Sequence, residues 1–112
     1  MPSRAVLDHI AALSESATKI VIAPDADLGG VRIATAIHQA LPPESQSRTM
    51  VCDVGVAEHA QQRPWAPDNP IWDAMKAART GPAASLARGC LERGYPVEQE
   101  AAIVECVKKY LR

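Results

Sequence analysis

The chain has 112 residues, which is the length of one small domain. Its composition is 47% hydrophobic, with two Trp, two Tyr and no Phe, so the core must be built from Ala, Val, Ile and Leu side chains. The formal net charge of −1 provides no whole-chain attraction to phosphate. Any nucleic-acid role must therefore be argued from a local site.

The cysteine pattern predicts a reducing compartment. Cys52, Cys90 and Cys106 are far apart in the sequence, odd in number and outside any CxxC pair, which argues against a disulfide framework and against a zinc knuckle. No apolar stretch approaches the roughly 18 residues of a membrane span, and residues 1–10 lack the layout of a signal peptide. We therefore expect a soluble cytoplasmic protein with no membrane partner.

The first predicted element is a short amphipathic helix at residues 4–14. Its apolar residues Val6, Ile10 and Leu13 recur at helical spacing. Ser3, directly before this run, is a residue type that often caps a helix N-terminus.

A strand–helix–strand unit is predicted next. A continuous apolar run rich in β-branched residues predicts a buried strand at residues 19–23, and a second short apolar run predicts another strand at 49–52. Between them, apolar residues at helical spacing predict a helix at 29–41, which Pro42 and Pro43 end. Such a unit closes right-handed, with its two strands parallel.

The C-terminal half is predicted to be helical. Residues 63–70 are rich in proline and should form an irregular connection. Three helices are expected after it, each opened by a proline in its first turn, at residues 71–79, 83–92 and 97–111. Basic residues lean toward this half, and a solvated helix face explains their distribution at least as well as attraction to phosphate does; they are Arg79, Arg88, Arg93, Lys108, Lys109 and Arg112.

These elements predict an α/β fold with a short parallel sheet, surrounding helices and a helical C-terminal half. One domain is expected over residues 1–112. Its strand–helix–strand core and the preceding helix would occupy residues 1–55, and the helical part would occupy residues 56–112.

Asp25 and Asp27 stand where the first predicted strand ends. Ligands of parallel α/β sheets gather beyond the carboxyl ends of the strands, and two carboxylates one residue apart can both face a hard cation such as Mg²⁺ or Mn²⁺. Gly29 and Gly30 would let the backbone turn sharply into the next helix, whose N-terminal amides would offer a place for a phosphate oxygen. The alternative is a helix N-cap with ordinary Asp-Gly turn chemistry.

Three further carboxylates are candidates for the same site. Asp53 ends the second predicted strand and should lie near Asp25, as a metal ligand or alternatively as a turn or N-cap residue. Glu98 and Glu100 would face the metal if the last helix begins beside the carboxyl edge of the sheet. The alternative for both is the general preference of acidic residues for the first turn of a helix.

The run KIVIAPDADLGGVRIATAIHQAL, residues 19–41, resembles the second half of a Toprim domain, in which an apolar strand is followed by DxDxxG and a helix. With Asp53 and YPVEQE at residues 95–100, the ordered set most closely resembles the C-terminal domain of JetD, the nuclease of the Wadjet anti-plasmid systems, and its uncharacterised relatives. DxD also occurs in haloacid-dehalogenase phosphatases as DxDGT, but Leu28 and Gly29 replace that Gly-Thr pair.

The Toprim resemblance covers most of the chain and implies a function. It implies Mg²⁺-dependent phosphodiester chemistry on DNA, of the nuclease or topoisomerase kind, with Asp25 and Asp27 as metal ligands and a further carboxylate, Glu98 or Glu100, completing the site. Condensin-like partner subunits are implied as well.

The chain also departs from the Toprim pattern. Toprim domains use a Glu at the end of an earlier strand, but Glu15, the one Glu before Asp25, is expected at the end of a helix, so the first strand and its Glu are predicted to be absent. Pro24 stands where the resemblance predicts Gly. The alternative function is therefore a non-catalytic subunit that binds DNA or a partner protein. An incomplete sheet also predicts a homo-oligomer or a partner chain that supplies the missing strand.

Overall fold

The structure is a computed structural model that describes residues 2–53 and 63–97. Within these ranges the chain is an α/β protein, as expected, and none of its described helices has the length and apolar character needed to span a membrane. In chain order the elements are α1 (Arg4–Ser14), β1 (Ile20–Ile22), α2 (Leu28–Ala40), α3 (Pro43–Gln46), β2 (Thr49–Val51), α4 (Ile71–Ala77), the 3₁₀ helix η1 (Ala78–Thr80) and α5 (Ala84–Arg93).

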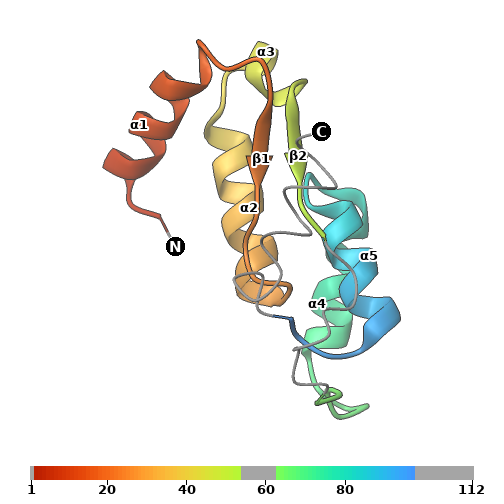
Figure 1. Cartoon of the computed structure of the whole chain (residues 1–112). Helices are drawn as coiled ribbons and strands as arrows, with labels where there is room; N and C mark the ends of the chain where they lie inside the picture. The colour runs from red at the N-terminus through yellow and green to blue at the C-terminus, as the bar shows by residue number, and fades with distance from the viewer. Residues whose placement is uncertain (1, 54–62, 98–112) are drawn as a thin grey trace.

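The two described strands pair in parallel, which confirms the predicted strand–helix–strand unit. Ile20 lies opposite Thr49 and Ile22 lies opposite Val51. Figure 1 shows the strands side by side, with α2 alongside them, α1 on one side and α4 and α5 on the other. Since parallel strands run in the same direction, the segments that follow β1 and β2 start at the same edge of the sheet.

The core lies between α2, the sheet and the C-terminal helices. α2 buries Val31 and Ala34 against Ile22 and Val51 of the strands. The C-terminal helices α4 and α5 contribute fully buried side chains of small to medium size to the same core, namely Met75, Leu86, Ala87 and Cys90. The core is therefore mainly aliphatic, as the composition predicts, although Met75, Cys90 and Tyr95 also belong to it.

α1 follows its predicted boundaries and is the least buried of the long helices. The hydroxyl oxygen of Ser3 accepts the N–H of Val6 at 3.2 Å, so the predicted N-cap is confirmed. α1 packs against α2, yet Val6 and Leu13 remain 49% and 60% exposed. Part of its apolar stripe therefore stays at the surface.

Three local features differ from the sequence-based expectation. The short helix α3 was not predicted; it begins at Pro43, whose fixed φ suits a first helical turn. α4 ends at Ala77 and tightens into η1 instead of continuing to residue 79. Val97 pairs with Ala26 in an antiparallel bridge instead of opening a helix, and the rest of that predicted helix, residues 98–111, lies outside the described residues.

The cysteines also differ from the expectation. Cys90 is a buried free thiol, but Cys52 is disulfide-bonded, so the prediction of cysteines without a disulfide is wrong for Cys52. The physical reason is that a disulfide depends on the separation of two Cα atoms in space, which sequence spacing does not determine.

Candidate functional site

The two carboxylates that follow β1 have different surroundings. Asp25 is exposed, and its backbone carbonyl accepts the N–H of Asp27 at 3.0 Å. Asp27 is half-buried and caps α2, because its Oδ1 accepts the N–H of Gly30 at 2.7 Å. The N-cap role that the sequence left open is therefore present at Asp27, where it uses one of the two carboxylate oxygens.

The backbone between these carboxylates is fixed by a segment that follows α5. Ala26 is fully buried, and its N–H donates to the Val97 carbonyl at 2.7 Å. The Val97 N–H donates back to the Ala26 carbonyl at 3.1 Å. This paired bridge holds the turn in place, so Asp25 and Asp27 project from a rigid backbone.

Gly30 lies where the first turn of α2 packs onto this turn. A Cβ atom at Gly30 would lie only 1.7 Å from the backbone carbonyl oxygen of Asp25. The lack of a side chain at Gly30 therefore permits this close approach of two backbone segments. Gly29 has more room, because its Cβ would lie 3.3 Å from Oδ1 of Asp27.

Asp53, which follows β2, forms an ion pair with Arg93 in the last turn of α5. Nη2 of Arg93 lies 2.9 Å from Oδ1 of Asp53, and the two side chains are only 8% and 14% exposed, respectively. The solvated helix face, one explanation of the basic residues in this half, does not hold for Arg93. Arg93 continues the buried stripe of Leu86 and Cys90 at helical spacing, so it points into the protein.

Gly89, one helical turn before Arg93, makes room for this ion pair. A Cβ atom there would lie 1.9 Å from Oδ2 of Asp53 and 3.2 Å from Nη1 of Arg93. Among the described residues, Nε and Nη2 of Arg93 are buried without a hydrogen-bond partner of good geometry. The contact to Asp53 is therefore an attraction between charges at short distance and not a well-directed hydrogen bond.

Cys90 connects the two strand ends electrostatically. The pKa of the Cys90 thiol is raised to about 11, mainly by burial. The Arg93 guanidinium lowers this pKa, and the carboxylates of Asp53 and Asp27 contribute to raising it. Because both carboxylates act on one thiol of α5, the ends of β1 and β2 face the same stretch of that helix.

In residues 2–53 and 63–97, no group of three or more His, Cys, Asp or Glu side chains is arranged to hold a metal ion. Asp25 and Asp27 carry oxygen atoms of the type that Mg²⁺ binds, and the cap uses one of the two carboxylate oxygens of Asp27. Asp53 faces a guanidinium instead, and Glu98 and Glu100 lie outside the described residues.

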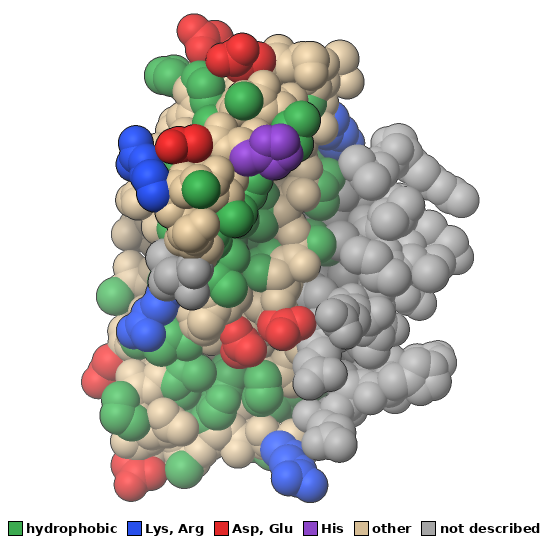
Figure 2. Space-filling model, turned by 90° about the vertical axis from the view of Figure 1, so that its left-hand side faces the viewer, with side chains coloured by type: hydrophobic (Ala, Val, Ile, Leu, Met, Phe, Trp, Pro, Cys, Tyr) green, Lys and Arg blue, Asp and Glu red, His purple; other side chains and the backbone are tan. Residues whose placement is uncertain are grey.

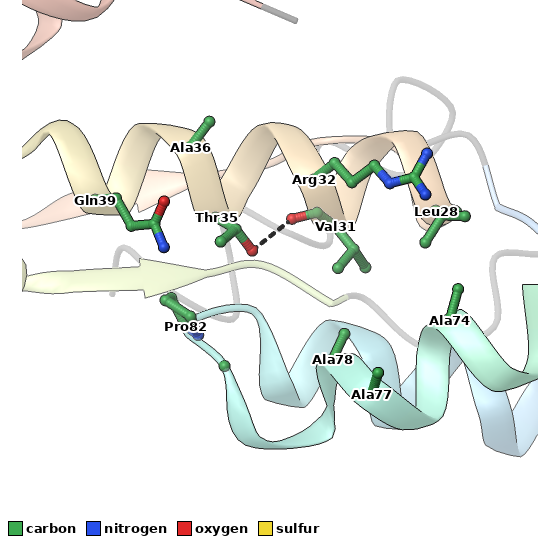
Figure 3. Close-up of a pocket in the computed structure, with 11 residues that line it drawn as sticks. Leu28, Val31, Arg32, Thr35, Ala36, Gln39, Ala74, Ala77, Ala78 and Pro82 are labelled. Atoms are coloured by element: carbon green, nitrogen blue, oxygen red, sulfur yellow. Dashed lines mark hydrogen bonds between the residues drawn. The ribbon is translucent and has the colours of Figure 1, made fainter.

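A groove of about 750 Å³ begins beside the acidic turn and runs along α2. Leu28 and Val31 of α2 face Ala74 and Ala78 of the opposite helices across it (Figure 3). Its lining is mainly small and apolar, with Arg32 as the one charged side chain among the lining residues. The groove carries no acid, thiol or imidazole, so the candidate chemistry stays at the ends of the strands.

Comparisons of the chain with protein-family models, with curated proteins and with solved structures found no match. Its function is therefore argued from the geometry of the strand ends and from the resemblance of its motif.

Proposed function

We propose that this chain is a Toprim-like module of a DNA-processing system, of the kind that the JetD nuclease domain represents in plasmid defence, and that Asp25 and Asp27 bind Mg²⁺ or Mn²⁺. One observation carries the proposal. Two carboxylates stand one residue apart on a backbone that the Ala26–Val97 bridge and the close approach of Gly30 hold at the carboxyl edge of a parallel sheet. Ligands of such sheets bind at this edge.

The residues of this turn are suited to a phosphate-bearing ligand only when a cation is present. A bound magnesium ion would supply charge neutralisation for a phosphodiester oxygen. Asp25 and Asp27 would hold that ion, and the N-terminus of α2 adds the positive end of a helix dipole beside it. Figure 2 shows acidic and basic side chains scattered over one face without a continuous basic patch, so charge alone would attract DNA only weakly to that face.

The Asp53–Arg93 ion pair favours a second candidate, a binding module without hydrolytic activity. Phosphodiester hydrolysis of the proposed kind needs a carboxylate in addition to Asp25 and Asp27, and Asp53 is held by a guanidinium. Such a module would bind DNA or a partner protein, for example a condensin-like subunit. The described sheet has two strands, so a partner strand or a second copy of the chain would complete it.

Ion binding and cleavage distinguish the two candidates. Mn²⁺ binding would be followed by electron paramagnetic resonance in the full chain and in Asp25→Asn and Asp27→Asn variants, because asparagine at position 27 keeps a cap acceptor while removing the charge. We expect a large loss of affinity in both variants.

Nicking of supercoiled plasmid in Mg²⁺, with chelator as control, would then support the nuclease, whereas ion binding without nicking would support the binding module. Equal Mn²⁺ binding by wild type and variants would overturn the metal site.

A further inference from the structure

The buried carboxylate of Asp53 needs positive charge close to it. Asp53 leaves β2 at the edge where Asp27 stands, and both carboxylates act on the Cys90 thiol. Removing a carboxylate from water is costly unless a cation or hydrogen bonds compensate it. A second negative charge nearby increases that need.

Arg93 meets this need from α5. Its guanidinium reaches back along the helix over Gly89, where the missing Cβ leaves space for both Asp53 and the guanidinium. The Arg93 side chain is 8% exposed, so almost the whole cation is enclosed. The carboxylate of Asp53 lies 2.9 Å from this guanidinium and offsets part of the cost of burying the cation.

We infer that Arg93 is a built-in counter-cation that takes the place of a divalent ion at Asp53. In this role Arg93 is a positioning residue: it neutralises Asp53 and keeps this carboxylate from acting as a metal ligand. The lack of a directed hydrogen bond at Nε and Nη2, among the described residues, fits a role based on charge. The inference goes beyond the proposed function, since it holds whether or not Asp25 and Asp27 bind an ion.

The charge role and a packing role make different predictions. If Arg93 only fills space, its removal lowers stability and added divalent ions do not restore it. If Arg93 replaces a divalent ion, its removal turns Asp53 into a ligand, and Mg²⁺ or Mn²⁺ then stabilises the fold through Asp53.

The test uses the full chain with Arg93→Gln. The thermal midpoint would be measured in chelator and in millimolar Mg²⁺ at constant ionic strength, and bound Mn²⁺ would be counted. We expect Arg93→Gln to lower the midpoint in chelator by several degrees, to gain more from Mg²⁺ than wild type does, and to bind one additional Mn²⁺ per chain. The double variant Asp53→Asn with Arg93→Gln should lose both effects of the added ion.

Matched controls separate the alternatives. Arg88→Gln removes an exposed arginine from the same helix and should respond to Mg²⁺ like wild type.

An equal midpoint gain in wild type and Arg93→Gln, or an unchanged Mn²⁺ count, would overturn the inference. If Arg93→Gln does not fold in chelator, it should refold in Mn²⁺ while the double variant does not, and failure in Mn²⁺ would also overturn it. Ion binding by wild type through Asp25 and Asp27 bears on the proposed function alone.

Discussion

The two strands of the sheet end in carboxylates that are held in opposite ways. After β1, Asp25 remains exposed, and the turn that carries it is fixed by main-chain contacts at Ala26 and Gly30. After β2, Asp53 is nearly enclosed and is held by a side chain, that of Arg93. Parallel topology brings both ends to one edge, but local contacts decide how far each carboxylate is exposed to solvent. Main-chain contacts position the turn that carries Asp25, whereas the Asp53 carboxylate contacts the side chain of Arg93.

The largest expected effect comes from breaking the backbone contact after β1. Gly30→Ala would place a Cβ 1.7 Å from the Asp25 carbonyl oxygen, and no side-chain rotation relieves an overlap with backbone. We expect a loss of unfolding free energy on the order of 3 to 5 kcal/mol, measured by urea denaturation.

Gly29→Ala is the matched control for this change, since both glycines lie in the first turn of α2. Its Cβ would meet only Oδ1 of Asp27 at 3.3 Å, so stability should change by less than about 1 kcal/mol. Equal stability of Gly30→Ala and wild type would show that the turn after β1 is not fixed by this backbone contact.

A smaller effect is expected from adding a methyl group at Gly89 of α5, which lies against Asp53. Gly89→Ala would place a Cβ 1.9 Å from Oδ2 of Asp53, but a carboxylate can rotate where a backbone cannot. We expect a loss of about 1 to 3 kcal/mol, part of which the higher helix propensity of alanine offsets. The loss should not add to that of Arg93→Gln, because both changes break the same ion pair.

Gly81→Ala is a control for adding a methyl group where space is available, because the nearest atom to its Cβ would be 3.7 Å away. It should change stability by less than about 0.5 kcal/mol. If the losses from Gly89→Ala and Arg93→Gln are additive, the effect of Gly89→Ala does not come from breaking the ion pair.

The sequence predicted the surroundings of Asp25 and Asp27, after β1, better than those of Asp53, after β2. After β1, most of the information is local. The features that matter there involve residues within ten positions of one another: the apolar run that forms β1, the aspartate before a helix and the Gly30 contact. The stretch from Ile20 to Ile22 is shorter than the predicted 19–23, because Lys19 and Ala23 are exposed beyond the paired residues.

The surroundings of Asp53, after β2, depend on contacts between segments that are distant in the sequence. Asp53 and Arg93 are 40 positions apart, and no periodicity in either segment indicates that they meet. A signal was nevertheless present in α5, because Arg93 falls on the same helical face as Leu86 and Cys90 and stands four residues after Gly89. A charged residue on an apolar face predicts a buried partner of opposite charge. Val97, expected in a helix, pairs with Ala26 for the same reason: a long-range contact overrides local propensity.

A third prediction separates the two roles of Asp27. Asp27→Ala removes the cap acceptor for the Gly30 N–H and should cost about 1 kcal/mol of unfolding free energy. Asp27→Asn retains an oxygen acceptor and should recover most of that loss in urea denaturation, while Mn²⁺ binding stays weak in both variants. Full stability of Asp27→Ala would mean that the capping bond does not support the turn.

The smallest expected effect reports on the charges that the two strand ends share. Burial raises the pKa of Cys90 from 9.0 to about 11, so the folded state keeps its thiol neutral while the unfolded chain ionises. The stability that depends on this neutral thiol is fully present below pH 9.0 and is lost as the pH rises toward 11, by an amount on the order of 1 kcal/mol. Stability of wild type and Cys90→Ala, followed over this range, should differ in slope, since groups other than Cys90 titrate equally in both. Arg93→Gln removes a charge that lowers the Cys90 pKa in the folded state, so the loss should still begin near pH 9.0 but should become larger and extend to higher pH. Parallel pH curves for wild type and Cys90→Ala would show that folding does not raise the pKa of Cys90.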